Sequence, residues 1–177
     1  MFKIDAYDFE WICGVEDDPE DACLHGRVRM QTENFAVEDS ATVSATALYL
    51  LRTLTEDHIF GEGAQMLPCC AHFMVPDDAL QNVWIDHCDN GVDWSVIHND
   101  GRIKIVLASG EESDISFEEY REEVYRFADK IEDYYNKCLP KQFDDDFKKN
   151  AYIAFCNEWR RRRNGGVKIL NIPCHAK

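Results

Sequence analysis

The sequence predicts an α+β fold, in which an antiparallel or mixed sheet of about six strands is covered by helices. Three observations predict it: alternating segments in the N-terminal half, an Asp-Gly turn between two apolar runs, and two long helical patterns near the C-terminus. The strands follow one another without the strand–helix alternation of parallel sheets. We expect one α+β domain over residues 1–164, with residues 165–177 as a C-terminal tail or a short edge strand.

Alternation predicts the first strands. Apolar or small residues occupy every second position of Leu24–Gln31, which is the period of a strand with one buried face. Asp8–Cys13 is the expected partner strand, joined to it through the acidic loop Glu16–Asp21. A helix is expected next over Ser40–Asp57, with Asp39 or Ser40 as its N-cap and aliphatic residues at helical spacing.

A β-hairpin is expected over residues 93–107. Two alternating apolar runs flank Asn99-Asp100-Gly101, and Asp-Gly in this position is a strong hairpin signal. With Asp100 and Gly101 as the two turn residues, the predicted pairs are His98 with Ile103, Val96 with Ile105, and Trp94 with Leu107. These six side chains then share one face, which we expect to be buried.

Two long helices are predicted to close the domain. Ser116-Phe117-Glu118-Glu119 is a capping box, in which Ser116 accepts from the Glu119 amide and the Glu119 side chain reaches back. The apolar stripe that follows ends before Pro140, which cannot continue a helix. A last helix starts near Asp144–Asp146 and ends near Arg160–Arg163, so its charges match the helix dipole.

The chain is strongly acidic, with 34 acidic against 19 basic residues and a net charge of −15. Nucleic acid and anionic membranes are poor partners because phosphate binding needs Lys and Arg, whereas a basic protein is a suitable partner. The acids of the Glu16–Asp21 run have no evident capping role, and exposed Trp is a common interface anchor. The expected partner-binding residues are therefore Glu16, Asp17, Asp18, Glu20, Asp21, Trp11 and Trp84. The alternative is that the acids keep the protein soluble.

The chain is expected to be cytoplasmic. No stretch approaches the about 20 apolar residues that span a bilayer, and Met1–Tyr7 lacks a basic segment followed by an apolar one. The eight cysteines mostly lie within apolar stretches. We expect reduced core residues in preference to the alternative, disulfides, because free Cys behaves as a small hydrophobe and the cytosol keeps thiols reduced.

The densest set of potential metal ligands lies in a second expected strand pair, Leu67–Val75 and Asn82–Cys88. A register that places Phe73 opposite Val83 brings four of them to one side: Cys70, His72, Asp86 and Cys88. Zinc prefers thiolate and imidazole ligands, so zinc is the candidate cofactor. The same alternation places Cys69 on the opposite face. The alternative is buried thiols and a hydrogen-bonded histidine, and no Cys-x-x-Cys pair supports the metal.

No known catalytic signature is present in the sequence. Neither a nucleophile elbow, a phosphate loop, a His-Glu-x-x-His motif nor a dinucleotide fingerprint occurs. We therefore assign no catalytic residue, and the sequence favours a binding protein over an enzyme.

The acidic, α+β character of the chain resembles that of the immunity proteins that bacteria make against their own polymorphic toxins. The residues that carry the resemblance are Glu16–Asp21, Asp77-Asp78, Glu118–Glu123 and Asp144–Asp146. It implies stoichiometric inhibition, in which carboxylates meet the basic cleft of a toxin, such as a nuclease, and electrostatic steering speeds association. Two alternatives remain: a metal-binding protein or enzyme using the Cys70, His72, Asp86 and Cys88 region, and a self-associating module with Trp11 and Trp84 in an exposed patch.

Overall fold

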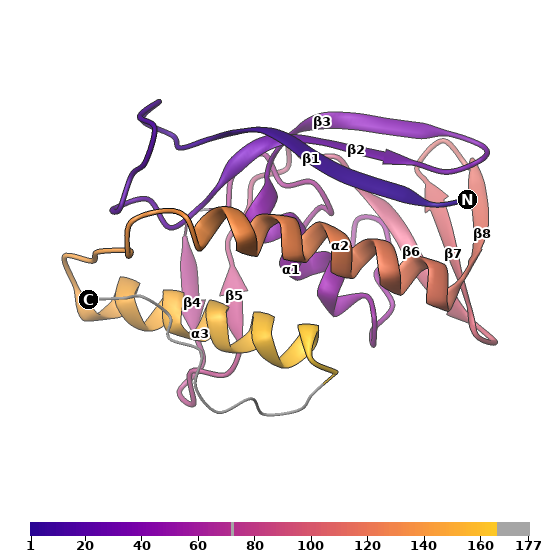
Figure 1. The fold of residues 1–177 in the computed structure, drawn as a ribbon. Coiled ribbons are helices and arrows are strands. Elements are labelled where there is room, and N and C mark those ends of the chain that lie inside the picture. The colour runs from indigo at the N-terminus through magenta and orange to yellow at the C-terminus, as the bar shows by residue number, and fades with distance from the viewer. Residues whose placement is uncertain (72, 166–177) are drawn as a thin grey trace.

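The computed structural model describes residues 1–71 and 73–165 and has an α+β fold (Figure 1). Eight strands form three antiparallel sheets, with orders β1-β2-β3, β4-β5 and β6-β7-β8. In chain order the elements are β1 Lys3–Glu10, β2 His25–Gln31, β3 Ala36–Thr42, α1 Val43–Arg52, β4 Met74–Pro76, β5 Val83–Ile85, β6 Trp94–Asn99, β7 Arg102–Leu107, β8 Glu112–Ser116, α2 Phe117–Tyr135 and α3 Asp146–Arg163. The predicted class is confirmed, whereas the single sheet of about six strands is wrong.

The first sheet confirms the strand predicted from the alternation of Gly26, Val28 and Met30, which are buried in β2. Its partner β1 begins earlier than predicted, because the apolar alternation of Ile4 and Ala6 supplies the buried face. The predicted segment Asp8–Cys13 overlaps only the end of β1. There the register shifts between Tyr7 and Glu10, and Asp8 has a φ of 52°.

Helix α1 is shorter than the predicted helix Ser40–Asp57. Asp39 and Ser40 lie in β3 rather than at a helix N-cap, and the helix begins directly after Thr42. Asp57 instead lies beyond its end, where one carboxylate oxygen accepts from the backbone amide of His98 at 2.8 Å. Nearly every residue of α1 is buried, because it contacts the first sheet on one side and α2 and α3 on the other.

The β6–β7 hairpin has the predicted register, with His98 paired to Ile103, Val96 to Ile105 and Trp94 to Leu107. Asp100 and Gly101 have φ values of 45° and 78°. These are the left-handed values that a two-residue type I′ turn requires. Strand β8, which was not predicted, pairs with β7 and leads directly into α2.

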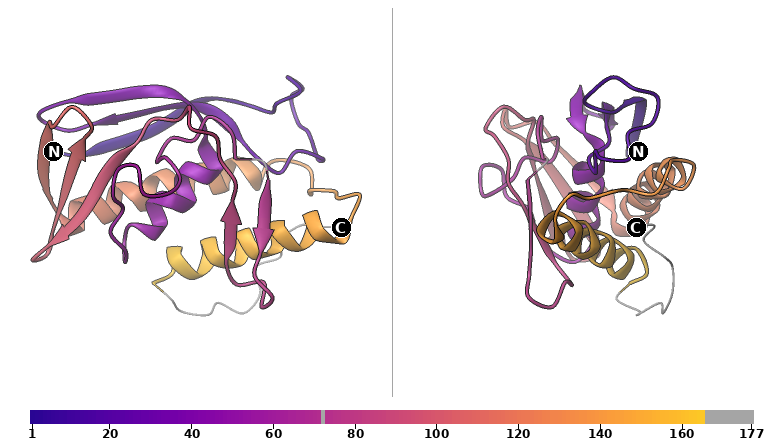
Figure 2. Two further views of the ribbon diagram at one scale, coloured as in Figure 1. Left: turned by 180° about the vertical axis from the view of Figure 1, so that it is seen from behind. Right: turned by 90° about the vertical axis from the view of Figure 1, so that its left-hand side faces the viewer.

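Helices α2 and α3 cover the molecule on the side away from the β6-β7-β8 sheet, and α1 lies between them and the strands (Figure 2). The Ser116 side chain accepts from the Glu119 amide at 3.2 Å, as the capping box predicts. The Glu119 carboxylate, however, accepts from the backbone amide of Phe2 at 2.7 Å. It therefore fastens β1 to α2 instead of completing the cap.

The third helix confirms the charge pattern of its ends, with Asp145 as N-cap and four arginines in its last turn. Gly165 has a φ of 62°, the left-handed conformation that commonly follows a helix end. The predicted tail or edge strand over residues 165–177 lies, apart from Gly165, outside the described residues. The buried apolar side chains of the described chain form one cluster, from Phe2 to Trp159.

The cysteines differ from the expected reduced core residues. Six described cysteines are free thiols, and of these only Cys23 is buried: Cys13, Cys23, Cys69, Cys70, Cys88 and Cys138. Burial raises the pKa of Cys23 to about 12, so this thiol stays protonated. Cys156 is disulfide-bonded, which corrects the expectation of thiols throughout.

Candidate functional site

The acidic loop between β1 and β2 is fastened to the connection between α2 and α3. The Leu139 amide donates to a carboxylate oxygen of Asp17 at 2.6 Å, and the Gln142 amide donates to the Pro19 carbonyl at 2.8 Å. Lys141 adds a bond from its Nζ to the Asp18 carbonyl at 2.6 Å. Both segments lie at the left-hand end of the molecule in Figure 1, and we call this region the acidic end.

Trp11 lies beneath the acidic end and is only 1% exposed. The Lys141 Nζ lies 3.4 Å from the centre of its ring, and the Tyr135 ring packs against it edge-on at 5.7 Å. Burial lowers the pKa of Lys141, and the surrounding carboxylates oppose that shift. Trp11 is therefore part of the core, and the prediction that it anchors a partner is wrong.

Three carboxylates of the acidic run have local structural roles. Asp21 accepts from the amides of Ile12 and Cys23, Asp18 accepts from the Glu20 amide and the Cys13 thiol, and Asp17 accepts from Leu139. Such side chain to backbone bonds are typical of Asp in turns. The absence of a local role, inferred from the sequence, is therefore wrong for these three residues.

Glu16 and Glu20 differ from their neighbours, because both are exposed and neither carboxylate forms an ion pair within the described part of the chain. Three apolar side chains of the acidic end are also exposed: Ile12 at 70%, Val15 at 50% and Leu139 at 58%. Sequence reasoning missed these three residues, since it looked for aromatic anchors. Unpaired carboxylates beside exposed aliphatic groups are the composition of a protein-binding surface.

Trp84 lies on β5 and is exposed, as the predicted partner-binding role requires. Phe73 and Phe147 are exposed as well, and their rings stack at 6.0 Å. Because Trp11 is buried, the described residues do not form the exposed Trp11 and Trp84 patch that the self-associating module needs.

The predicted metal-ligand set is only partly assembled. Met74 pairs with Ile85, and the Asp86 amide donates to the Phe73 carbonyl, so the register differs by three residues from the predicted one. Asp86 is exposed and does not join the cysteines, and His72 lies outside the described residues.

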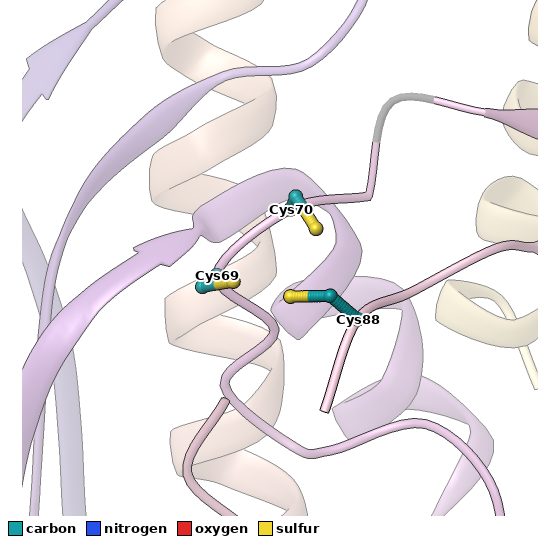
Figure 3. Close-up of side chains that lie close together, drawn as sticks. All are labelled: Cys69, Cys70 and Cys88. Atoms are coloured by element: carbon teal, nitrogen blue, oxygen red, sulfur yellow. The ribbon is translucent and has the colours of Figure 1, made fainter. Parts of the chain in front are cut away.

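Cys69 takes the place of Asp86 beside Cys70 and Cys88. The three Sγ atoms lie within 4.8 Å of one another, and Figure 3 shows the side chains converging from two separate segments. Sequence reasoning missed Cys69 because it assumed a strand through this residue. The chain bends there instead, and a bend removes the alternation that would separate two consecutive side chains.

Two of the three thiols have shifted pKa values. Hydrogen bonds from Cys69 and Cys70 lower the pKa of Cys88 to about 7, because they stabilise its thiolate form. The hydrogen bond with Cys88 raises the pKa of Cys69, since that thiol acts as the donor. The lowered pKa increases the thiolate fraction of Cys88 near neutral pH, and the thiolate is the form that binds metals and attacks electrophiles.

Comparison of the chain with protein-family models, with curated proteins and with solved structures gave no significant match. Within the described residues no helix combines the length and the apolar character that crossing a bilayer requires.

Proposed function

We propose that this chain is a cytoplasmic, acidic protein-binding domain that neutralises a basic protein by stoichiometric binding, as immunity proteins neutralise toxins. The observation that carries the proposal is the acidic end, where Ile12, Val15 and Leu139 are exposed beside the carboxylates of Glu16 and Glu20, which form no ion pair with the described residues. Apolar anchors supply the area that is buried in a complex, and the carboxylates select and steer a basic partner.

The distribution of basic residues supports a basic partner. Arg162 pairs with Glu158 and Glu56, and Arg163 pairs with Asp129 at 2.5 Å. Two arginines of the run at the end of α3 are therefore engaged with acids of the same chain, and Arg161 donates to the Gln81 carbonyl at 3.1 Å. With a net charge of −15, the surface field favours cationic partners.

The test begins by purifying the tagged chain from cells that make it naturally. A partner protein that copurifies in a 1:1 ratio with the chain is identified and produced in pure form. Calorimetry then compares the wild type with Glu16→Lys/Glu20→Lys and with Ile12→Ser/Leu139→Ser. We expect a 1:1 complex with a basic protein, weakened about 10-fold or more by each double variant and by added salt.

The matched control is Glu62→Lys/Glu111→Lys, which changes the net charge equally at exposed positions outside the acidic end. It should leave the affinity within about threefold of the wild type, because distant surface charges are screened. The proposal fails if no protein is retained in equal amounts, or if the control weakens binding as much as the variants of the acidic end.

A further inference from the structure

The thiol cluster is separate from the acidic end and has a geometry of its own. Cys69 is exposed, while Cys70 and Cys88 are half-buried, so the three sulfur atoms are close together and open to solvent on one side. Figure 3 shows all three thiols directed toward a common space. A cation in that space would contact all three sulfur atoms, and only small backbone movements would be needed.

The distances suit a thiophilic ion. A Zn–S bond of about 2.3 Å in tetrahedral geometry places sulfur ligands about 3.8 Å apart. The sulfur atoms of the cluster already lie within 4.8 Å of one another, so side-chain rotations of about 1 Å bring them to that spacing. Thiolate ligands favour soft and borderline ions over Mg²⁺ or Ca²⁺, which prefer oxygen.

The two segments that carry the cysteines are held together on both sides of the cluster. Leu67 and Val92 exchange backbone hydrogen bonds of 2.9 and 3.0 Å, and the Asp86 amide donates to the Phe73 carbonyl at 2.8 Å. The Thr42 amide also donates to the Pro68 carbonyl at 2.8 Å. Cys69 and Cys88 therefore lie between fixed points, which lowers the entropy that is lost when a ligand is bound.

Gly91 permits this close approach of the two segments. A Cβ atom at Gly91 would lie 2.5 Å from the Leu67 carbonyl oxygen and 2.9 Å from the Gln65 Cβ, distances that no side chain tolerates. The glycine is required by the narrow spacing beside the cluster and not by a left-handed φ, since its conformation is ordinary.

We propose that Cys69, Cys70 and Cys88 together bind one thiophilic divalent cation of the zinc type. Three metal–sulfur bonds form, and the protons of the thiols leave to solvent as the bonds form. The exposed side of the cluster leaves a fourth coordination position for water or a small ligand, the arrangement of a zinc site with an open position. The site does not depend on the proposed protein-binding function.

The experiment uses Co²⁺ and Zn²⁺ alone as probes on the reduced, chelator-treated full chain. We expect one Co²⁺ per chain with thiolate-to-cobalt charge-transfer absorption, and displacement of Co²⁺ by one equivalent of Zn²⁺. We expect metal binding to weaken about 10-fold or more in each of the variants Cys69→Ser, Cys70→Ser and Cys88→Ser. Even mutation of a residue that only hydrogen-bonds a metal ligand lowers metal affinity by about that factor. Cys13→Ser is the matched control, because Cys13 is an exposed thiol outside the cluster, and it should bind as the wild type does.

A second measurement on the wild type needs no variant. Alkylation mapped by mass spectrometry should show that Zn²⁺ protects Cys69, Cys70 and Cys88 while Cys13 stays reactive. Either of two results overturns the proposal: the absence of a charge-transfer band on adding Co²⁺, or protection of Cys13 by Zn²⁺ equal to that of the three clustered cysteines. Neither of these results bears on the acidic end, so the two proposals fail independently.

Discussion

Glu158 lies where α3, α1 and β5 meet, and it is only 1% exposed. Its carboxylate accepts from Arg52 at 2.9 Å, from Arg162 at 2.8 Å and from the Val83 amide at 2.9 Å. Burial alone would raise the pKa of Glu158, but the hydrogen bonds and charge of Arg52 outweigh it, and the pKa falls below its ordinary value. At the scale of the residue, this carboxylate holds three elements together.

Replacing Glu158 with Gln should lower the free energy of unfolding by about 3–5 kcal/mol at pH 7, because Arg52 is left without its buried partner. Because the pKa of Glu158 is lower in the folded state, its ionised form stabilises the fold at pH values above the ordinary pKa of 4.5. This contribution disappears as the pH falls through the folded-state pKa. The difference between variant and wild type should therefore shrink below pH 4.5. Urea denaturation at several pH values measures it.

Glu56→Gln is the control for that experiment. Glu56 pairs with Arg162 at 2.8 Å but is 57% exposed, so its loss should cost less than about 1 kcal/mol. Equal losses for the two variants would contradict the structural role of Glu158.

At the scale of the element, turn geometry separates the hairpin that was predicted correctly from the one that was not. The two-residue Asp100-Gly101 turn leaves one register for β6 and β7. The β4–β5 turn is longer, and it is held by the Asp77 carboxylate, which accepts from the Gln81 amide and the Asn82 side chain. Pro76-Asp77-Asp78 does not reveal the length of this turn, so the predicted register was wrong by three residues.

Gly101→Ala should destabilise the protein by about 1 kcal/mol, because its φ of 78° lies in the left-handed region. Apart from its two chain neighbours, no residue has an atom within 4 Å of a Cβ built at this position, so the cost comes from the backbone conformation. Thermal unfolding of Gly101→Ala beside Gly101→Asn measures it. Asn tolerates this region better, and an equally large loss in both variants would argue for a steric cause instead.

At the scale of the whole molecule, the net charge of −15 means that acidic side chains far outnumber basic ones. Some acids are neutralised by arginines, as Glu38 is by Arg27 at 2.7 Å, but the excess of acids remains. Self-repulsion of this kind opposes the compact state and is screened by salt.

Raising NaCl from about 0.01 M to about 0.1 M shortens the Debye length from about 30 Å to about 10 Å, which weakens the repulsion. We expect a gain of about 1 kcal/mol, or about 2–4 °C in melting temperature for a chain of this size. Calorimetry in NaCl and in choline chloride should give the same shift if screening causes it. A melting temperature that falls with salt would show that attractive ion pairs dominate.

The sequence by itself determined the α+β class, β2, the β6–β7 hairpin with its register, and both C-terminal helices. Each of these depends on signals within a few residues: a period of two, an Asp-Gly turn, a Ser or Asp cap. Three sheets instead of one, the burial of Trp11 under Lys141 and the meeting of Cys69 and Cys70 with Cys88 were decided only by the tertiary structure. These features bring together segments far apart in sequence, and their free energies come from contacts that no local pattern records.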